Sequence, residues 1–321
     1  MSEPVFEEIE LMAVVPDNMI GERLDVAAAQ LFDSYSRGAL QGWIKEGKLL
    51  LDGKKEKPKI KVEPGQTLTL SAVLEADDRW LPEPMELDIV YEDDHVIVVN
   101  KPAGLVVHPG AGNSTATLIN GLLHHAPEIS ALPRAGVVHR IDKETSGLLM
   151  VAKSLKAHKS LVEQLQEKTV FREYQALAVG GIKLDFTIDA PIARHPTQRV
   201  KMAIVDEGKP AVTHISIEKR YQHFTWIKAQ LETGRTHQIR VHMAYQGYPL
   251  VGDSVYGKPY FPKGATPELR SALQQFKRQA LHAFALGFVH PETQEFCSFE
   301  APLPEDMQLI IQRFDEDPGE N

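Results

Sequence analysis

The amino-acid sequence predicts an α+β protein of two domains, a small basic module followed by a larger strand-rich domain. The chain has 321 residues, and at roughly 100 to 200 residues per domain two domains are the default expectation. Apolar residues recur at helical spacing in some stretches and at strand spacing in others. An acidic segment carries Pro82 and Pro84, which break regular structure and indicate a linker. We therefore predict domains at 1–75 and 88–321, joined by a linker at 76–87.

The composition is that of an ordinary globular protein, with 43% hydrophobic and 25% charged residues. Disordered and collagen-like classes are therefore excluded. The chain has one cysteine, Cys297, which excludes an internal disulfide framework and any cage of several thiolates. The N-terminus is acidic where a targeting peptide is basic, and no apolar run approaches the ~18 residues of a membrane span. We expect a soluble, cytoplasmic protein.

Charge is distributed unevenly along the chain. The net charge is −9, which taken whole argues against a nucleic-acid partner. From Arg37 to Lys61, however, eight residues are basic and only three are acidic. A solvated surface and a contact with phosphates both fit this run, and the charge pattern alone leaves them open.

The first 75 residues predict two helices and a small sheet. The stretch GERLDVAAAQLF has apolar residues at helical spacing, and a second helix is predicted to begin at a Ser36 cap and end at Gly47. Asp52-Gly53 is a type I′ hairpin dipeptide, and Pro64-Gly65 precedes the alternating strand QTLTLS.

In order, R-L-D, S-R and W-I-K-E-G-K-L-L-L-D-G-K resemble the small RNA-binding domain first known from ribosomal protein S-four, over about 55 residues. This resemblance implies that Arg37, Lys45 and Lys48 contact RNA.

The second domain alternates strands and helices. The turn Glu92-Asp93-Asp94 joins two apolar strands, and the Gly- and Pro-rich stretch that follows them predicts a loop. The remaining predictions, in chain order, are a helix in GLLHHA, strands at 135–138 and 148–152 around a polar loop, a helix after a Ser154 cap, a strand in REYQALAVGG, a strand-rich block at 200–231, helices at 236–246 and 267–277, a strand in LHAFALGFVH and a final helix.

Several kinds of chemistry lack their sequence signature. There is no phosphate-binding G-x-x-x-x-G-K-[ST], and Gly110 and Gly112 lack the third glycine of a dinucleotide turn. The zinc pattern His-Glu-x-x-His and the nucleophile elbow Gly-x-Ser-x-Gly do not occur. Cys297 lies in the alternating segment EFCSF, where a free cysteine is usually a small packing residue. Neither a metal nor an organic cofactor is expected.

Polar residues are dense in the segment His139 to Gly147. Asp142 stands between Arg140 and Lys143, which favour an ionised carboxylate able to act as nucleophile or base. Gly147 allows the backbone to turn tightly. The same residues also fit a loop in which the aspartate caps a turn and the arginine faces solvent.

Two further segments combine charged and aromatic residues. In Arg172-Glu173-Tyr174 the tyrosine lies on a predicted strand, where such a residue is more often part of the core. In Glu232 to His242, Thr236 is predicted to cap a helix whose N-terminus faces Arg235, an arrangement suited to an anion. Arg240 lies one turn further on and suits either a functional carboxylate or an ordinary structural ion pair.

Three segments together, HRIDKETSGLLMVAK, REYQALAVG and LETGRTHQIRVHMAYQGYPLVGDSVYG, resemble the RluA family of RNA pseudouridine synthases. The resemblance extends over about 200 residues with the motifs in the family's order. It implies a mixed, largely antiparallel sheet with flanking helices and a cleft for RNA. It is strongest to members that act on large-subunit ribosomal RNA, so the implied partner is that RNA or a pre-ribosomal particle, with the protein acting in ribosome maturation as a monomer.

The resemblance also implies roles for individual residues. Asp142 matches the catalytic aspartate, Tyr174 the tyrosine that stacks on the target base, and Arg240 the basic partner of the aspartate. Arg140 matches the arginine that fills the gap left by a flipped base, and Arg235 is expected to contact RNA. Moving the base of uridine from N1 to C5 changes no composition, so this isomerisation needs no cofactor. The alternatives are a non-catalytic ribosome-assembly protein on the same fold and a methyltransferase that uses Cys297.

Overall fold

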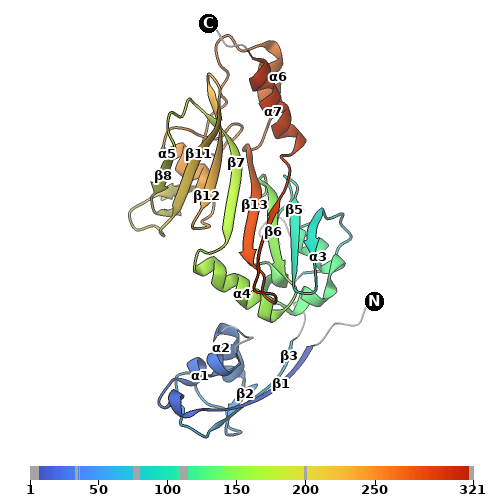
Figure 1. Ribbon diagram of the computed structural model, residues 1–321, viewed down its shortest axis with the longest axis vertical. Coiled ribbons are helices and arrows are strands. Elements are labelled where there is room, and N and C mark those ends of the chain that lie inside the picture. The colour runs from blue at the N-terminus through green and yellow to red at the C-terminus, as the bar shows by residue number, and fades with distance from the viewer. Residues whose placement is uncertain are drawn as a thin grey trace.

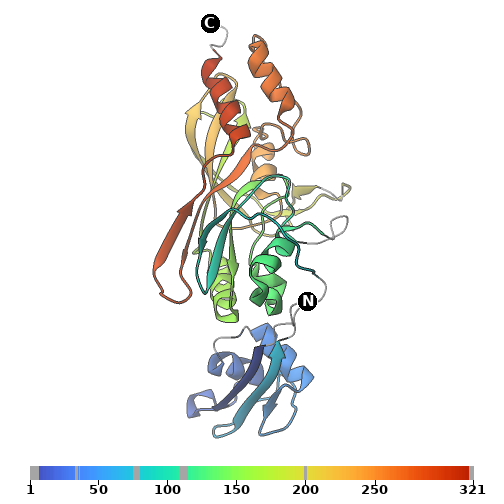
Figure 2. The same ribbon diagram turned by 90° about the vertical axis from the view of Figure 1, so that its right-hand side faces the viewer.

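The computed structural model describes residues 7–32, 35, 37–74, 80–108, 115–198 and 201–317. Figure 1 shows a small N-terminal module at one end of the molecule, below the end of a large sheet at which helix α4 (Leu155–Gln166) lies. Helices α6 (Pro267–Gln275) and α7 (Glu305–Glu316) lie at the opposite end. The view in Figure 2 shows the same separation of the module from the sheet.

The module contains helices α1 (Leu24–Leu31) and α2 (Arg37–Glu46), as predicted. Its sheet has the order β1-β3-β2, formed by β1 (Glu7–Val14), β3 (Thr67–Leu74) and β2 (Leu49–Leu51). The acidic segment that forms β1 was not predicted as a strand. Gly47 has φ +82° after α2, as predicted. The proposed Ser36 cap lies outside the described residues.

The predicted turn at Asp52-Gly53 is present, and both residues have positive φ, as type I′ requires. The turn does not lead into a second strand. After it, only Lys54 pairs with β2, through an isolated bridge to Leu51. The partner of β2 is β3 instead. The interval between them is rich in lysine and has few apolar residues to place on a sheet face.

The larger domain is built on a sheet of nine strands, which is mixed and mostly antiparallel as predicted. Its order is β4-β5-β6-β13-β7-β12-β11-β8, with β14 also pairing with β13. The strands are β4 (Ile89–Glu92), β5 (Val96–Lys101), β6 (Ser146–Ala152), β7 (Phe171–Val179), β8 (Phe186–Asp189), β11 (Val212–Arg220), β12 (Phe224–Leu231), β13 (Leu281–Val289) and β14 (Phe296–Glu300). A separate ribbon is formed by β9 (Ile192–Arg194) and β10 (Met202–Ile204).

The centre of the sheet is buried on both faces. Strand β6 reads SGLLMVA and is buried along its whole length, the continuous apolar pattern expected of a covered strand. One face packs against α3 (Leu118–His125) and α5 (Gln238–Tyr245). The other packs against α4 near β6 and against α6 and α7 near β7 and β12. Such a centre is rigid enough to hold a site on its loops.

The strand predicted at 135–138 is wrong. Residues Pro133–Gly136 form a 3-10 turn, and Arg134 and Ala135 have φ of +54° and +47°. Only Val137 makes an isolated bridge, to Val151. The apolar run is buried against the sheet as a turn, since a short apolar run does not by itself distinguish a strand from another buried segment.

The described part of the segment between the domains, residues 80–88, forms neither helix nor strand. It is not detached from the larger domain, because Asn120 Nδ2 donates to the Leu81 carbonyl at 2.7 Å and Leu87 packs on the core. Among the described residues, no helix has the length and hydropathy of a transmembrane span.

Candidate active site

A cleft of about 620 Å³ opens beside the start of β7. Its walls come from the loop before β6, from the end of α4 and from the segment that joins β12 to α5. Positive charge exceeds negative charge on these walls. The charged lining residues are Arg134, Arg140, Lys168, Arg172, Arg235 and Arg240 against Asp142 and Glu232. This surplus suits a polyanion such as RNA.

Asp142 and Arg240 meet in this cleft although they are 98 residues apart in the chain. Arg240 Nη1 donates to Asp142 Oδ2 at 2.9 Å. The same guanidinium donates through Nε and Nη2 to both oxygens of Asp253, at 2.7 and 3.0 Å. Burial alone would lower the pKa of Arg240, but these hydrogen bonds raise it. Arg240 is thus a permanently charged bridge between a cleft carboxylate and a buried one.

Asp253 is the partner that holds Arg240 in place. Its side chain is 1% exposed, and its Oδ1 also accepts hydrogen bonds from the backbone N–H groups of Val255 and Tyr256. Burial alone would raise the pKa of Asp253, but the hydrogen bonds from Arg240 keep it below its ordinary value. Bidentate pairing of this kind fixes both position and orientation. Sequence reasoning did not assign Asp253, although it left a carboxylate partner for Arg240 open.

The start of α5 differs from the prediction. Thr236 does not cap the helix; His237 precedes it in a left-handed conformation, with φ 57° and ψ 22°. The turn is held by the buried amide of Gln238, whose Oε1 accepts from Thr233 Oγ1 at 2.8 Å and from the Arg235 backbone N–H at 2.9 Å. Gln238, the first residue of the helix, therefore holds the turn that precedes it, and the N-cap residue His237 makes no side-chain cap hydrogen bond.

The loop that carries Asp142 is fixed by close contacts. Lys101 is 1% exposed, and its Nζ donates to the backbone carbonyl of Lys143 at 3.0 Å. Burial lowers the pKa of Lys101 to about 7. Gly147 follows at φ +112°, where a Cβ would lie 2.3 Å from the Ala283 carbonyl oxygen on β13. Glycine therefore permits the approach of β6 to β13 that sets the loop.

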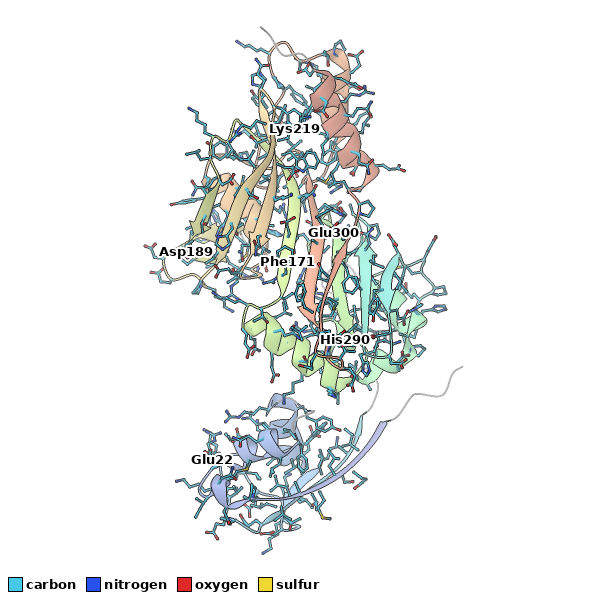
Figure 3. All side chains as sticks on the ribbon, viewed as in Figure 1. Glu22, Phe171, Asp189, Lys219, His290 and Glu300 are labelled. Atoms are coloured by element: carbon cyan, nitrogen blue, oxygen red, sulfur yellow. The ribbon has the colours of Figure 1, made fainter. Side chains whose placement is uncertain are left out.

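Tyr174 lies on β7 and is buried, with its side chain at the cleft wall. Burial raises the pKa of its hydroxyl to about 12, with Arg172 acting in the opposite direction and Asp142 in the same direction. The hydroxyl is therefore protonated at neutral pH. Figure 3 labels Phe171, the first residue of β7, in the middle of the sheet, and Tyr174 lies three residues further along this strand.

Arg172 is buried next to Tyr174 in the same cleft. Its Nη2 donates to the Glu232 carbonyl at 3.2 Å, and its Nε has no hydrogen-bond partner in the structure as described. A Cβ at Gly234 would lie 2.9 Å from Nη1. The small residue at 234 thus admits the guanidinium into the cleft wall.

The five predicted RNA-contact residues lie in two places. Arg140 and Arg235 line the cleft. Arg140 is exposed and lies 3.2 Å from His108 Nε2, and Arg235 Nε donates to the Pro210 carbonyl at 3.1 Å. The other three are on or just after α2. Arg37 pairs with buried Asp25 at 2.7 Å, Lys48 with Glu46 at 3.0 Å, and Lys45 is exposed. The RNA contacts themselves stay predictions.

Cys297 lies on β14 and does not line the cleft. Its Sγ donates to the Phe288 carbonyl at 3.3 Å, and burial raises the pKa of the thiol. Both observations describe a packing residue rather than an activated thiolate. Within the described ranges, no three or more His, Cys, Asp or Glu side chains come together as a possible metal site.

Comparison with known proteins identifies the class. RNA pseudouridylate synthases match residues 95–245, and the S4 domain matches residues 22–68. Together with relatives that are about half identical over nearly the whole chain, these matches show that the chain belongs to the RluA family of RNA pseudouridine synthases, as its motifs predicted. The protein is therefore an isomerase that acts on RNA.

The chain is 52% identical over 304 residues to the ribosomal large subunit pseudouridine synthase D of Pseudomonas aeruginosa, covering 94% of this chain and 95% of that protein. It is 48% identical over 308 residues to the protein of the same name from Escherichia coli K12, covering 95% and 94%. Human RNA pseudouridylate synthase domain containing 1 is similar in structure, with a TM-score of 0.53 and 26% identity, covering 74% of this chain and all of that one.

Proposed function

We propose that this enzyme converts specific uridines of large-subunit ribosomal RNA to pseudouridine, in the cytoplasm and as a monomer, during ribosome maturation. One observation carries the proposal: Asp142 lies against Arg240 in a basic cleft whose wall includes Tyr174. The near-complete coverage of relatives named for the large ribosomal subunit supports the substrate.

The reaction breaks the N1–C1′ bond of uridine, turns the base while it is held, and forms a C5–C1′ bond. The C5 proton is lost and N1 gains one, so the atoms balance without a co-reactant. Asp142 attacks C1′ or removes the C2′ proton, and in either role it stabilises positive charge that develops on the ribose. Arg240 holds the carboxylate in position.

The target base has to leave the RNA stack before Asp142 can reach its sugar, which costs a few kcal/mol. Tyr174 supplies a face on which the flipped base stacks, worth about 1–3 kcal/mol. Arg140, exposed at the rim of the cleft, occupies the space that the base vacates. Because the Tyr174 hydroxyl is protonated at neutral pH, it takes the C5 proton only after passing on its own.

The test is Asp142→Asn, which keeps the size of the side chain and removes its charge. Turnover should fall at least ~10³-fold, while the dissociation constant for ribosomal RNA stays within about threefold because phosphate contacts dominate affinity. Single-turnover conversion and binding are measured on the same RNA. Cys297→Ala, which alters a thiol outside the cleft, is the matched control and should keep full turnover. An Asp142→Asn enzyme with near wild-type conversion would refute the proposed role.

A further inference from the structure

His237 is a second side chain directed at Asp142. Its Nε2 lies 3.8 Å from Asp142 Oδ2, the oxygen that also accepts from Arg240. At this distance the two groups do not form a hydrogen bond. A small polar group of the substrate placed beside them would be within hydrogen-bond reach of both.

The imidazole is fixed by its other nitrogen. His237 Nδ1 lies 2.8 Å from the Tyr256 hydroxyl, and the two rings meet edge to face with centroids 5.6 Å apart. Tyr256 is held in turn, since its hydroxyl accepts from the Met202 backbone N–H at 2.8 Å and its ring lies 5.1 Å from the Arg240 guanidinium carbon. With Nδ1 occupied, Nε2 is the nitrogen left for a ligand.

The backbone at His237 is held in an uncommon conformation. A non-glycine residue with φ near 57° is strained, and such strain persists where the surroundings over-determine it, commonly at functional sites. Here the surroundings are the Gln238 amide, which also donates from Nε2 to the Val212 carbonyl at 2.9 Å and to Thr213 Oγ1 at 3.0 Å. The strained turn therefore directs the His237 imidazole into the cleft.

Burial lowers the pKa of His237. The charged and titratable groups around it are Asp142, Arg240, Asp253, Arg140 and Tyr256, from the β6 loop, α5 and the segment after it. The two aspartates oppose the shift and the two arginines favour it. A neutral imidazole is both a donor and an acceptor and matches a hydroxyl better than a phosphate.

Resting on the proposed function, we propose that His237 binds the ribose 2′-hydroxyl of the flipped uridine and so makes the enzyme prefer RNA to DNA at the target nucleotide. Asp142 works at C1′ or C2′, and the 2′-oxygen is bonded to C2′, so a nitrogen 3.8 Å from Asp142 lies beside that hydroxyl. The 2′-hydroxyl is the group by which a protein distinguishes RNA from DNA at one position.

The experiment compares two synthetic RNA hairpins that differ in one atom. Both carry a uridine that the wild-type enzyme converts in ribosomal RNA, one as the ribonucleotide and one as 2′-deoxyuridine. All proteins tested for binding carry Asp142→Asn, so that turnover does not disturb the equilibrium. With His237 present, the dissociation constant should be about three to ten times larger for the deoxy hairpin. With His237→Gly, which relieves the backbone strain, the ratio should fall to about one.

Two further variants separate binding from a structural role. Tyr256→Phe keeps the ring over Arg240 and removes the hydroxyl that orients Nδ1, so the ratio should fall between these values. Gln294→Gly changes another left-handed residue that does not line the cleft and should leave the ratio unchanged. A structural role for His237 would weaken both hairpins equally, so an unchanged ratio in His237→Gly overturns the proposal. A ratio of one with His237 present overturns it as well.

Wild-type conversion of the ribonucleotide hairpin is measured in parallel. If neither this hairpin nor full-length ribosomal RNA is converted, the proposed function is wrong. If the RNA is converted but the ratio of dissociation constants is unchanged in His237→Gly, only the proposed role of His237 is wrong.

Discussion

The two domains hold positive charge in different ways. In the cleft, two guanidinium groups are buried and bonded: Arg240 to two carboxylates and Arg172 to a backbone carbonyl. On the N-terminal module, the run from Lys54 to Lys61 presents exposed lysines. A rigid guanidinium fork costs little further ordering when it meets a specific atom, whereas a flexible lysine follows phosphates at no set position. We therefore expect the fixed guanidinium groups to serve the chemistry of the cleft and the exposed lysines to serve affinity alone.

The module nevertheless contains one fixed cluster. Asp25 is fully buried and accepts hydrogen bonds from Arg23, Arg37 and Gln41. This cluster ties the start of α1 to α2. Arg37, predicted from the resemblance to contact RNA, is therefore already engaged inside the protein, which favours the exposed Lys45 as the more available contact.

The largest expected effect comes from breaking the fixed charge of the cleft. Arg240→Met leaves Asp253 buried without its partner, and removing one side of a buried pair costs about 3–5 kcal/mol. Turnover should fall by ~10²-fold or more because Asp142 loses its positioning donor. Denaturant unfolding and single-turnover conversion measure the two effects separately.

A companion variant distinguishes stability from chemistry. Arg240→Met with Asp253→Asn removes the stranded charge and keeps an oxygen for the Val255 and Tyr256 N–H groups. Most of the lost stability should return and turnover should not. Recovery of turnover in the double variant would contradict a positioning role for Arg240.

The second effect concerns the fixed cluster of the module. Burial alone would raise the pKa of Asp25, but hydrogen bonds from Arg23, Gln41 and Arg37 lower it from 3.8 to about 2. Because the folded pKa is below the unfolded one, the ionised carboxylate stabilises the fold above pH ~4, and this contribution is lost as the pH falls toward 2.

Asp25→Asn should therefore destabilise the module by about 1–2 kcal/mol at pH 7, a value reduced by the partial exposure of both arginines. The difference from wild type should shrink toward pH 2. Hydrogen exchange of α1 and α2 amides in the full chain measures it, with Asp52→Asn at the exposed turn as control. A difference that stays constant with pH would show that the charge of Asp25 is not what stabilises the cluster.

The sequence predicted elements with strong local signals well, and sites that depend on distant contacts less well. The helix after Ser154 is capped as expected, with Ser154 Oγ accepting from the Ala157 N–H. The predicted Thr236 cap is wrong because the Gln238 side chain reaches back to hold the turn before α5. That contact depends on tertiary packing around β11. The strand predicted at 135–138 is wrong because a turn can bury this apolar run against β6 as well as a strand can.

The candidate site shows the same division. The resemblance placed Asp142, Tyr174 and Arg240, and the structure brings these three to one cleft. Asp253 and Tyr256 were not assigned, because a single Asp or Tyr after a glycine-rich turn has no distinguishing pattern. Their positions depend on how the segment after α5 folds back onto it, which local spacing does not encode.

The smallest expected effect tests the lysines on and just after α2. Lys45→Gln with Lys48→Gln should lower the slope of log affinity against log salt by ~1.4–1.8, since each lost phosphate contact lowers it by ~0.7–0.9. Affinity at moderate salt should fall only severalfold, and single-turnover conversion at saturating enzyme should stay at the wild-type rate because neither lysine lines the cleft. Lys258→Gln with Lys263→Gln, exposed lysines between α5 and α6, is the matched control for net charge. Equal slopes for the two double variants would mean that the module contributes only general charge, and a loss of saturated rate in the first would mean that its lysines help position the RNA for the chemical step.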